Sequence, residues 1–196
     1  MKNLIILILA FCSVIIFSCE QEEEKNNNKE IKSFIVPADY PSIQSAIDAS
    51  VDGDTIFVLP GTYKENINFN GKEIIVCSTE PDNPEIVETT IINGDKKGTV
   101  VTFNSSETSS SVLDGFKIIN GDAGTSNGGG IAITNTSKPV IKNCIISNNT
   151  AQYGAGIFIS EQSHPVIENN IFTSNTADGR RGAAIYAIKK SSVTID

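Results

Sequence analysis

The segments GGGIAI (128–133), GAGIFI (154–159) and GAAIYA (182–187) are copies of one motif, separated by 26 and 28 residues. A second motif keeps the same register, as VLDGFKI (112–118), VIKNCII (140–146) and VIENNIF (166–172). A repeat of this length, with Ile, Val, Gly and Asn at fixed places, is typical of a solenoid, in which each copy stacks on the next. The apolar runs are short and are punctuated by Gly and Asn, so they predict strands rather than helices.

Alternation within each motif predicts which side chains point into the solenoid, because successive residues of a strand face opposite sides. The expected inward residues are Ile141, Ile167, Ile146, Phe172, Ile131, Ile157, Ile185, Ile133 and Ile159. The expected outward residues are Lys142, Glu168, Ala132, Phe158 and Tyr186. Between the strands, Asn and Gly tolerate a left-handed backbone, and stacked Asn side chains can form a hydrogen-bonded ladder. We expect one such corner at Gly115, Asn143 and Asn169, and a second at Gly121, Asn149 and Asn175.

The N-terminus has the pattern of an export signal. A short basic start precedes an apolar run from Leu4 to Phe17, which is too short for a membrane span and suits the hydrophobic region of a signal peptide. The residues Ile16-Phe17-Ser18-Cys19 resemble the lipobox of bacterial lipoproteins, which implies a signal peptide over 1–18 and lipidation of Cys19. The alternative is an ordinary signal peptide cut near Ser18. Residues 19–32 are charged and rich in Asn, so we expect a disordered tether.

Acidic residues directly after Cys19 resemble the export signal of surface lipoproteins in some Gram-negative bacteria, which implies an exported, outer-membrane-anchored protein that contacts the membrane through its lipid alone. The net charge of −8 argues against nucleic acid as a partner, because a sequence-independent binder needs a basic stripe. The other two cysteines outside the signal, Cys77 and Cys144, fall about two coils apart, so we expect buried free thiols rather than a disulfide.

The start of the domain carries a resemblance to a known superfamily. Ile43, Ala46 and Ile47 make one apolar face of a short helix, with Ser42 or Tyr40 as its N-cap, and such a helix would cover one end of the solenoid. The segments YPSIQSAIDAS (40–50) and GDTIFVLPGTYKENI (53–67) resemble the first coil of pectin-lyase-like proteins, above all pectinesterases. The resemblance implies an all-β fold for 33–196: a right-handed parallel β-helix of about five coils with an N-terminal capping helix. Residues 78–88 are expected to form a polar loop.

The candidate binding residues lie where the repeats differ. Inserts at 122–127, 152–153 and 178–181 should project on one side, beside the outward residues of the following strands. Together they predict a groove whose residues are Asp122, Asn127, Tyr153, Phe158, Asp178, Arg180, Arg181 and Tyr186. Aromatic faces and Arg suit acidic sugars. The alternative is that these are solvated turns with an ordinary outward cross-strand pair.

The resemblance assigns no catalytic residue. Lyases of the superfamily pair an Arg or Lys base with carboxylates that hold Ca²⁺, and Arg180 or Arg181 near Asp178 matches this only in part. The QAV-, QDT- and DFIFG-like motifs of pectinesterases do not occur. Calcium would therefore enter only if the protein were a lyase, and no other cofactor or metal is expected.

Three functions follow from these observations. The first is a monomeric, lipid-anchored module that binds a polysaccharide or surface glycan without a complete catalytic set. The second is a polysaccharide lyase or hydrolase, and the third is a structural spacer. Residues 192–196 align with the start of another repeat, so we also expect that catalytic coils could lie beyond Asp196.

Overall fold

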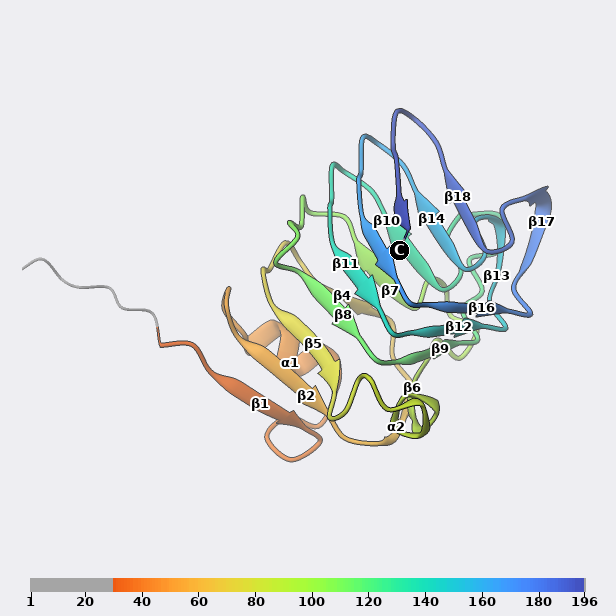
Figure 1. The fold of residues 1–196 in the computed structure, drawn as a ribbon. Coiled ribbons are helices and arrows are strands. Elements are labelled where there is room, and N and C mark those ends of the chain that lie inside the picture. Colours follow the sequence, from red (N-terminus) through yellow and green to blue (C-terminus); the bar gives the residue numbers. More distant parts are fainter. Residues whose placement is uncertain (1–29, 196) are drawn as a thin grey trace, which may run out of the picture.

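The computed structural model describes residues 30–195, which form a parallel β-solenoid of about five coils (Figure 1). Every strand pair in this region is parallel, and each strand pairs with its equivalents in the neighbouring coils. The strands gather into three long sheets and one short one. The predicted fold class, an all-β parallel solenoid, is therefore confirmed.

The first sheet has seven strands and runs the length of the solenoid. Its strands are β1 (Ser33–Val36), β2 (Thr55–Val58), β5 (Ile75–Ser78), β8 (Val112–Asp114), β11 (Val140–Lys142), β15 (Val166–Glu168) and β19 (Thr194–Ile195). The second sheet follows the first within each coil. Its strands are β3 (Gly61–Tyr63), β6 (Thr90–Asn93), β9 (Lys117–Ile119), β12 (Ile145–Ser147) and β16 (Ile171–Thr173).

The third sheet completes each coil before the chain returns to the first. Its strands are β4 (Ile67–Asn68), β7 (Val101–Phe103), β10 (Ile131–Ile133), β14 (Ile157–Ile159) and β18 (Ile185–Ala187). In the last two full coils a fourth sheet, made of β13 (Thr150–Tyr153) and β17 (Thr176–Arg181), bridges the second and third sheets.

The core is a column of stacked aliphatic side chains. Ile141 pairs with Ile167 and with Leu113, and Ile131 pairs with Ile157 and with Val101, so aliphatic residues recur at successive levels. All of the predicted inward residues are buried except Phe172 and Ile185, which are partly buried and pack against the core. The thiols of Cys77 and Cys144 are free and buried, as predicted.

The corners differ in detail from the prediction. At the first corner Gly115, Asn143 and Asn169 do have positive φ. At the second corner the left-handed residues are Asn120, Asn148 and Ser174, one position before the residues predicted. Asn149 and Asn175 instead turn their amides inward and bond to each other, with Nδ2 of Asn149 3.1 Å from Oδ1 of Asn175. The hydrogen-bonded ladder of Asn149 and Asn175 is therefore as predicted, but the left-handed backbone conformation occurs at the residue before each of them.

Two short helices flank the strands within residues 30–195. The predicted helix is α1 (Ile43–Ala49), in which Ser42 is the N-cap and Ile43, Ala46 and Ile47 are buried. The Glu65 carboxylate accepts from the N–H groups of the first turn, as a negative charge at a helix N-terminus should.

The second helix, α2 (Pro84–Thr89), corrects the prediction of a loop at 78–88. Asn83 caps it and Pro84 occupies its first turn, which is the usual place for proline in a helix. Its six residues are too few to show a helical period in the sequence.

Candidate binding groove

The outer face of the third sheet carries a groove at its C-terminal end, with a volume of about 440 Å³. Ten residues line it, and they come from β14, β18, the ends of β13 and β17, the loop before β10, and the turns after β10, β14 and β18. They are Asn127, Thr134, Tyr153, Phe158, Ser160, Glu161, Arg181, Tyr186, Ile188 and Lys189. Five of these were predicted from the sequence: Asn127, Tyr153, Phe158, Arg181 and Tyr186.

Three aromatic rings form one wall of the groove. Phe158 and Tyr186 occupy equivalent positions on β14 and β18, and their stacked rings have centroids 6.2 Å apart. Tyr153 approaches the same tyrosine from the end of β13, with ring centroids 5.4 Å apart. Although Phe158 points outward as predicted, its side chain is only 9% exposed. The three rings therefore make a continuous surface rather than isolated side chains.

The position of Tyr153 depends on a close approach by β17. The pairing of β13 with β17 shifts register between Ala151 and Tyr153, where the longer insert is accommodated. Gly179 lies directly against the tyrosine, because a Cβ atom at this glycine would fall 2.3 Å from Cε1 of Tyr153 and 2.5 Å from the Gln152 carbonyl oxygen. Only glycine allows β17 to come this near the ring.

One cation in the groove has no carboxylate partner. Within residues 30–195, no carboxylate forms an ion pair with the exposed Arg181. The hydrogen bond to Tyr186 raises the pKa of Arg181, and the electrostatic influence of Tyr186 and Tyr153 adds to it. Arg181 stays protonated in any case, so its role is to place a fixed positive charge beside the aromatic wall.

Polar groups line the opposite side. Nζ of Lys189 lies 3.1 Å from Oε1 of Glu161, so this cation is already paired. Oδ1 of Asn127 is buried and has no hydrogen-bond partner in the described part of the chain. A buried acceptor without a donor is unfavourable, and a ligand hydroxyl entering the groove could satisfy it.

The remaining predicted residues lie elsewhere. Asp178 lines a separate cavity of about 410 Å³ with Gly124, Thr125, Gln152 and Gly179. Asp122 lines neither cavity, since its Oδ1 accepts from the N–H of Gly124 and so closes a local turn. For Arg180 the structure describes the backbone within β17 but not the side chain. Cys19 and the signal peptide lie outside the described residues.

The residues that the third corner contributes to the groove were not predicted from the repeats. There the chain turns through two consecutive left-handed residues in three successive coils, at Asn135-Thr136, Glu161-Gln162 and Lys189-Lys190. Because these turns stack, Glu161 and Lys189 come together at the edge of the groove. The sequence signal was the equivalent position of the two residues, 28 apart, in successive repeats.

Among residues 30–195 no group of three or more His, Cys, Asp or Glu side chains is placed to hold a metal ion. The helices in this part of the chain are too short to cross a membrane.

The stacked parallel coils and the lateral groove define the class of protein as a right-handed parallel β-helix. The family model described as "right handed beta helix region" matches residues 45–196, and the chain belongs to this family. Comparisons with curated proteins and with solved structures gave no match. Membership of this family defines the scaffold of the chain.

Proposed function

We propose that this protein is an exported, lipid-anchored module that binds a surface polysaccharide through the groove on its third sheet. The observation that carries the proposal is the wall of Tyr153, Phe158 and Tyr186 beside the unpaired cation of Arg181. Sugar rings present C–H faces that pack on aromatic rings, and their hydroxyls need the polar groups that line the other side. A site of this kind is concave and mostly apolar, with a few convergent polar groups.

Arg181 argues for an acidic sugar. Its guanidinium offers a planar set of donors that matches a carboxylate, and the groove holds no described carboxylate that already occupies it. Lys189 cannot take this role without first releasing Glu161. We therefore expect acidic saccharides to bind more tightly than neutral ones of the same length.

The test is binding of the full chain in detergent to an array of acidic and neutral oligosaccharides, followed by calorimetry on the best ligand. Tyr186→Ala should weaken binding about tenfold, which corresponds to about 1.4 kcal/mol, and Arg181→Ala should abolish the preference for acidic sugars. The matched control is Phe57→Ala, which removes a partly buried aromatic from the first sheet and should leave binding unchanged. Equal losses in the control and in Tyr186→Ala would overturn the groove as the binding site.

The same samples separate the other two functions. A lyase incubated with polygalacturonate and Ca²⁺ would produce unsaturated sugars that absorb in the ultraviolet, and a rate lost in Arg181→Ala would replace binding by catalysis as the function. A spacer would bind no glycan on the array. Binding without product formation is the result that the proposal requires.

We further propose that Cys19 carries the lipid and that α1 covers the N-terminal end of the core. The buried face of α1 and its contacts with β1, β2 and β4 support the second proposal. Cys19→Ala should move the protein from the membrane fraction to the soluble fraction. Unchanged fractionation would exclude lipidation at Cys19.

A further inference from the structure

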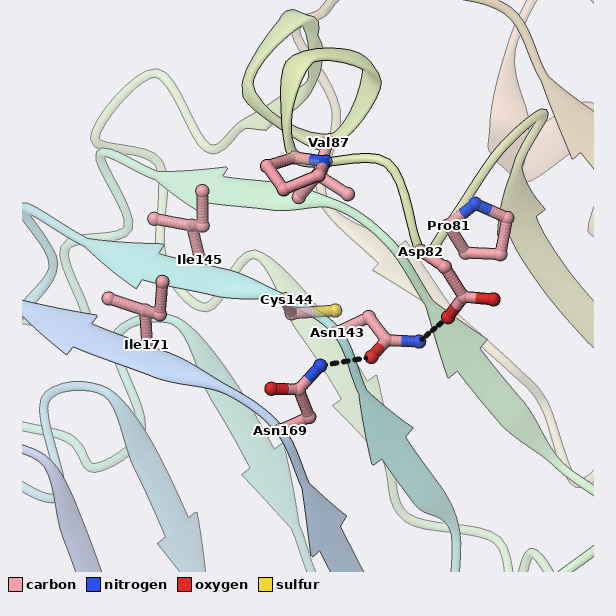
Figure 2. A pocket seen from close by; sticks show the side chains of 9 residues that line it. Pro81, Asp82, Val87, Asn143, Cys144, Ile145, Asn169 and Ile171 are labelled. Atoms are coloured by element: carbon pink, nitrogen blue, oxygen red, sulfur yellow. Dashed lines mark hydrogen bonds between the residues drawn. The ribbon is translucent and has the colours of Figure 1, made fainter.

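A second pocket lies on the other side of the solenoid, on the outer face of the second sheet. It has a volume of about 140 Å³, is open to solvent, and lies between the segment 81–87 on one side and β12 and β16 with the residues before them on the other (Figure 2). Its size is close to the ~150 Å³ of a cavity that admits a benzene ring, so it suits one side chain rather than a polymer. This pocket is independent of the groove proposed above to bind a glycan.

One end of the pocket is apolar. The outward residues Ile91, Lys117, Ile145 and Ile171 are in register on successive strands of the second sheet. Helix α2 packs on β6 and β9, at the start of this row, and Val87 of the helix is buried there. The row then emerges from beneath the helix at Ile145, and Ile171 is 59% exposed. Figure 2 shows Val87, Ile145 and Ile171 together at this end.

The other end is polar and acidic. Asn143 donates from Nδ2 to Oδ1 of Asp82 at 3.1 Å, and its own Oδ1 accepts from Asn169 at 2.7 Å (Figure 2). No cation lies within ion-pair distance of Asp82 in the described residues. Lys142 is near enough to feel its charge, but the Lys142 ammonium is bound by Asp114 at 3.1 Å. Asp82 therefore presents a negative charge that the chain itself does not neutralise.

The surroundings extend this charge. Glu80 and Glu85 are exposed on the same segment and form no ion pair within residues 30–195. Glu88 is the one carboxylate of α2 with a cation, since it pairs with Lys117. The whole chain carries a net charge of −8, so a second copy would bring like charge to this acidic rim. The charge favours a different, basic partner.

We propose that this pocket docks a Lys or Arg side chain from a basic, aliphatic segment of another protein. The aliphatic stem would pack on Ile145 and Ile171, and the charged head would reach the Asp82 carboxylate. Lys and Arg are suited to a pocket of this kind, because they bury an apolar stem while keeping the cation in a polar environment. Neighbouring aliphatic residues of the partner would cover the exposed part of Ile171.

The test uses the full chain in detergent and a fluorescein-labelled peptide of sequence Leu-Lys-Ile-Lys-Leu, with binding followed by fluorescence anisotropy. The matched probe replaces both lysines by glutamates. The basic peptide should bind, and the acidic one should bind at least about tenfold more weakly. Asp82→Asn and Ile171→Ser should each weaken the basic peptide about fivefold, because each removes one end of the pocket while leaving the core intact.

Two control variants remove the same chemistry elsewhere. Ile75→Ser changes a partly exposed aliphatic residue on the first sheet, and Asp95→Asn removes one surface negative charge near Lys64 and Lys97. Neither should change the affinity of the basic peptide. The proposal is overturned if both peptides bind equally, if neither binds, or if the controls weaken binding as much as Asp82→Asn and Ile171→Ser. Self-association that Ile171→Ser abolishes, seen by sedimentation, would assign the pocket to a second copy instead and would also overturn it.

Discussion

Asn149 and Asn175 lie one coil apart and are joined by two hydrogen bonds to the same atom. Oδ1 of Asn175 accepts from both the backbone N–H and Nδ2 of Asn149, each at 3.1 Å. Asn149 in turn bonds to the preceding coil: its Oδ1 accepts from the N–H of Gly121, and its Nδ2 donates to the Ile118 carbonyl. The ladder therefore satisfies backbone groups at a corner where strand pairing is interrupted.

Replacing Asn149 by Ala should lower the free energy of unfolding by about 2–4 kcal/mol. The change leaves the N–H of Gly121 buried without its partner, at a cost of about 1–3 kcal/mol, and it also removes the side-chain hydrogen bonds to Ile118 and Asn175, which are worth about 1 kcal/mol each. Urea denaturation followed by circular dichroism measures the effect. Asn66→Ala is the control, because this exposed side chain makes one hydrogen bond, to Thr99, and should cost less than about 1 kcal/mol. Equal losses of unfolding free energy in Asn149→Ala and Asn66→Ala would show that the ladder stabilises the fold no more than an ordinary surface hydrogen bond does.

Glu107 should contribute about as much to the stability of the fold as Asn149, because its buried carboxylate connects three segments. Oε1 accepts from the N–H of Gly71, while Oε2 accepts from the N–H of Ser105 and the hydroxyl of Ser137 at 2.7 Å. Glu107→Ala should destabilise the fold by about 3 kcal/mol, because hydrogen bonds to a charged group are worth about 1.5–3 kcal/mol each, while the buried Ser137 hydroxyl keeps its bond to the Thr134 carbonyl and so limits the loss. Glu85→Ala, on an exposed part of α2, is the matched control. A loss below about 1 kcal/mol for Glu107→Ala would contradict this role.

Gly179→Ala should reduce binding in the groove more than it reduces the stability of the fold. The added methyl group would overlap the Tyr153 ring and the Gln152 carbonyl, so β17 has to move away and the tyrosine loses its place beside Tyr186. If the groove binds a glycan, we expect affinity to fall about tenfold or more, with a change in unfolding free energy of about 1–2 kcal/mol. Calorimetry and urea denaturation on one sample separate the two effects. In the control Gly61→Ala, the new methyl group meets only ordinary contacts at 3.5 Å or more.

The buried thiols should make the fold sensitive to high pH. Burial raises the pKa of Cys144 to about 12, and burial together with the nearby Asp114 charge raises the pKa of Cys77 to about 11. Both thiols ionise near pH 9 when the chain unfolds, so the unfolded state gains stability as pH rises above 9. The contribution of the two thiols to stability should be constant below pH 9 and should fall as the pH rises from 9 to about 12.

Urea midpoints at pH 8 and pH 10.5 measure the fall, and Cys144→Ala should reduce the difference between the two midpoints because it removes one of the two titrating groups. Native Cys77 and Cys144 should also resist alkylation until urea is added, which peptide mass mapping detects. Rapid alkylation of either residue in the native protein would contradict their burial.

The repeat predicted the stacking of Ile141 on Ile167 and of Phe158 on Tyr186, because strand alternation and a constant register decide which side chains meet. It misplaced the second corner because Gly121 suggested a left-handed residue at that position. In the folded chain this glycine is required for close approach instead, because a Cβ at Gly121 would lie 1.9 Å from the Gly129 carbonyl oxygen of the same coil. Glycine is used both for a left-handed backbone and for close approach, and the sequence pattern does not distinguish these two reasons.

The groove depends partly on the sequence repeat and partly on how the folded chain packs. The residues of the repeat are enough to predict the solenoid, its core and the outward position of Tyr186, since these depend on the alternation of side chains along each strand and on a fixed repeat length. Only the folded chain brings Arg181 against Tyr186, pairs Glu161 with Lys189 and leaves Asp122 and Asp178 outside the groove. Those outcomes depend on how inserts of different length pack on one another at a corner, and the period of the sequence carries no information about that packing.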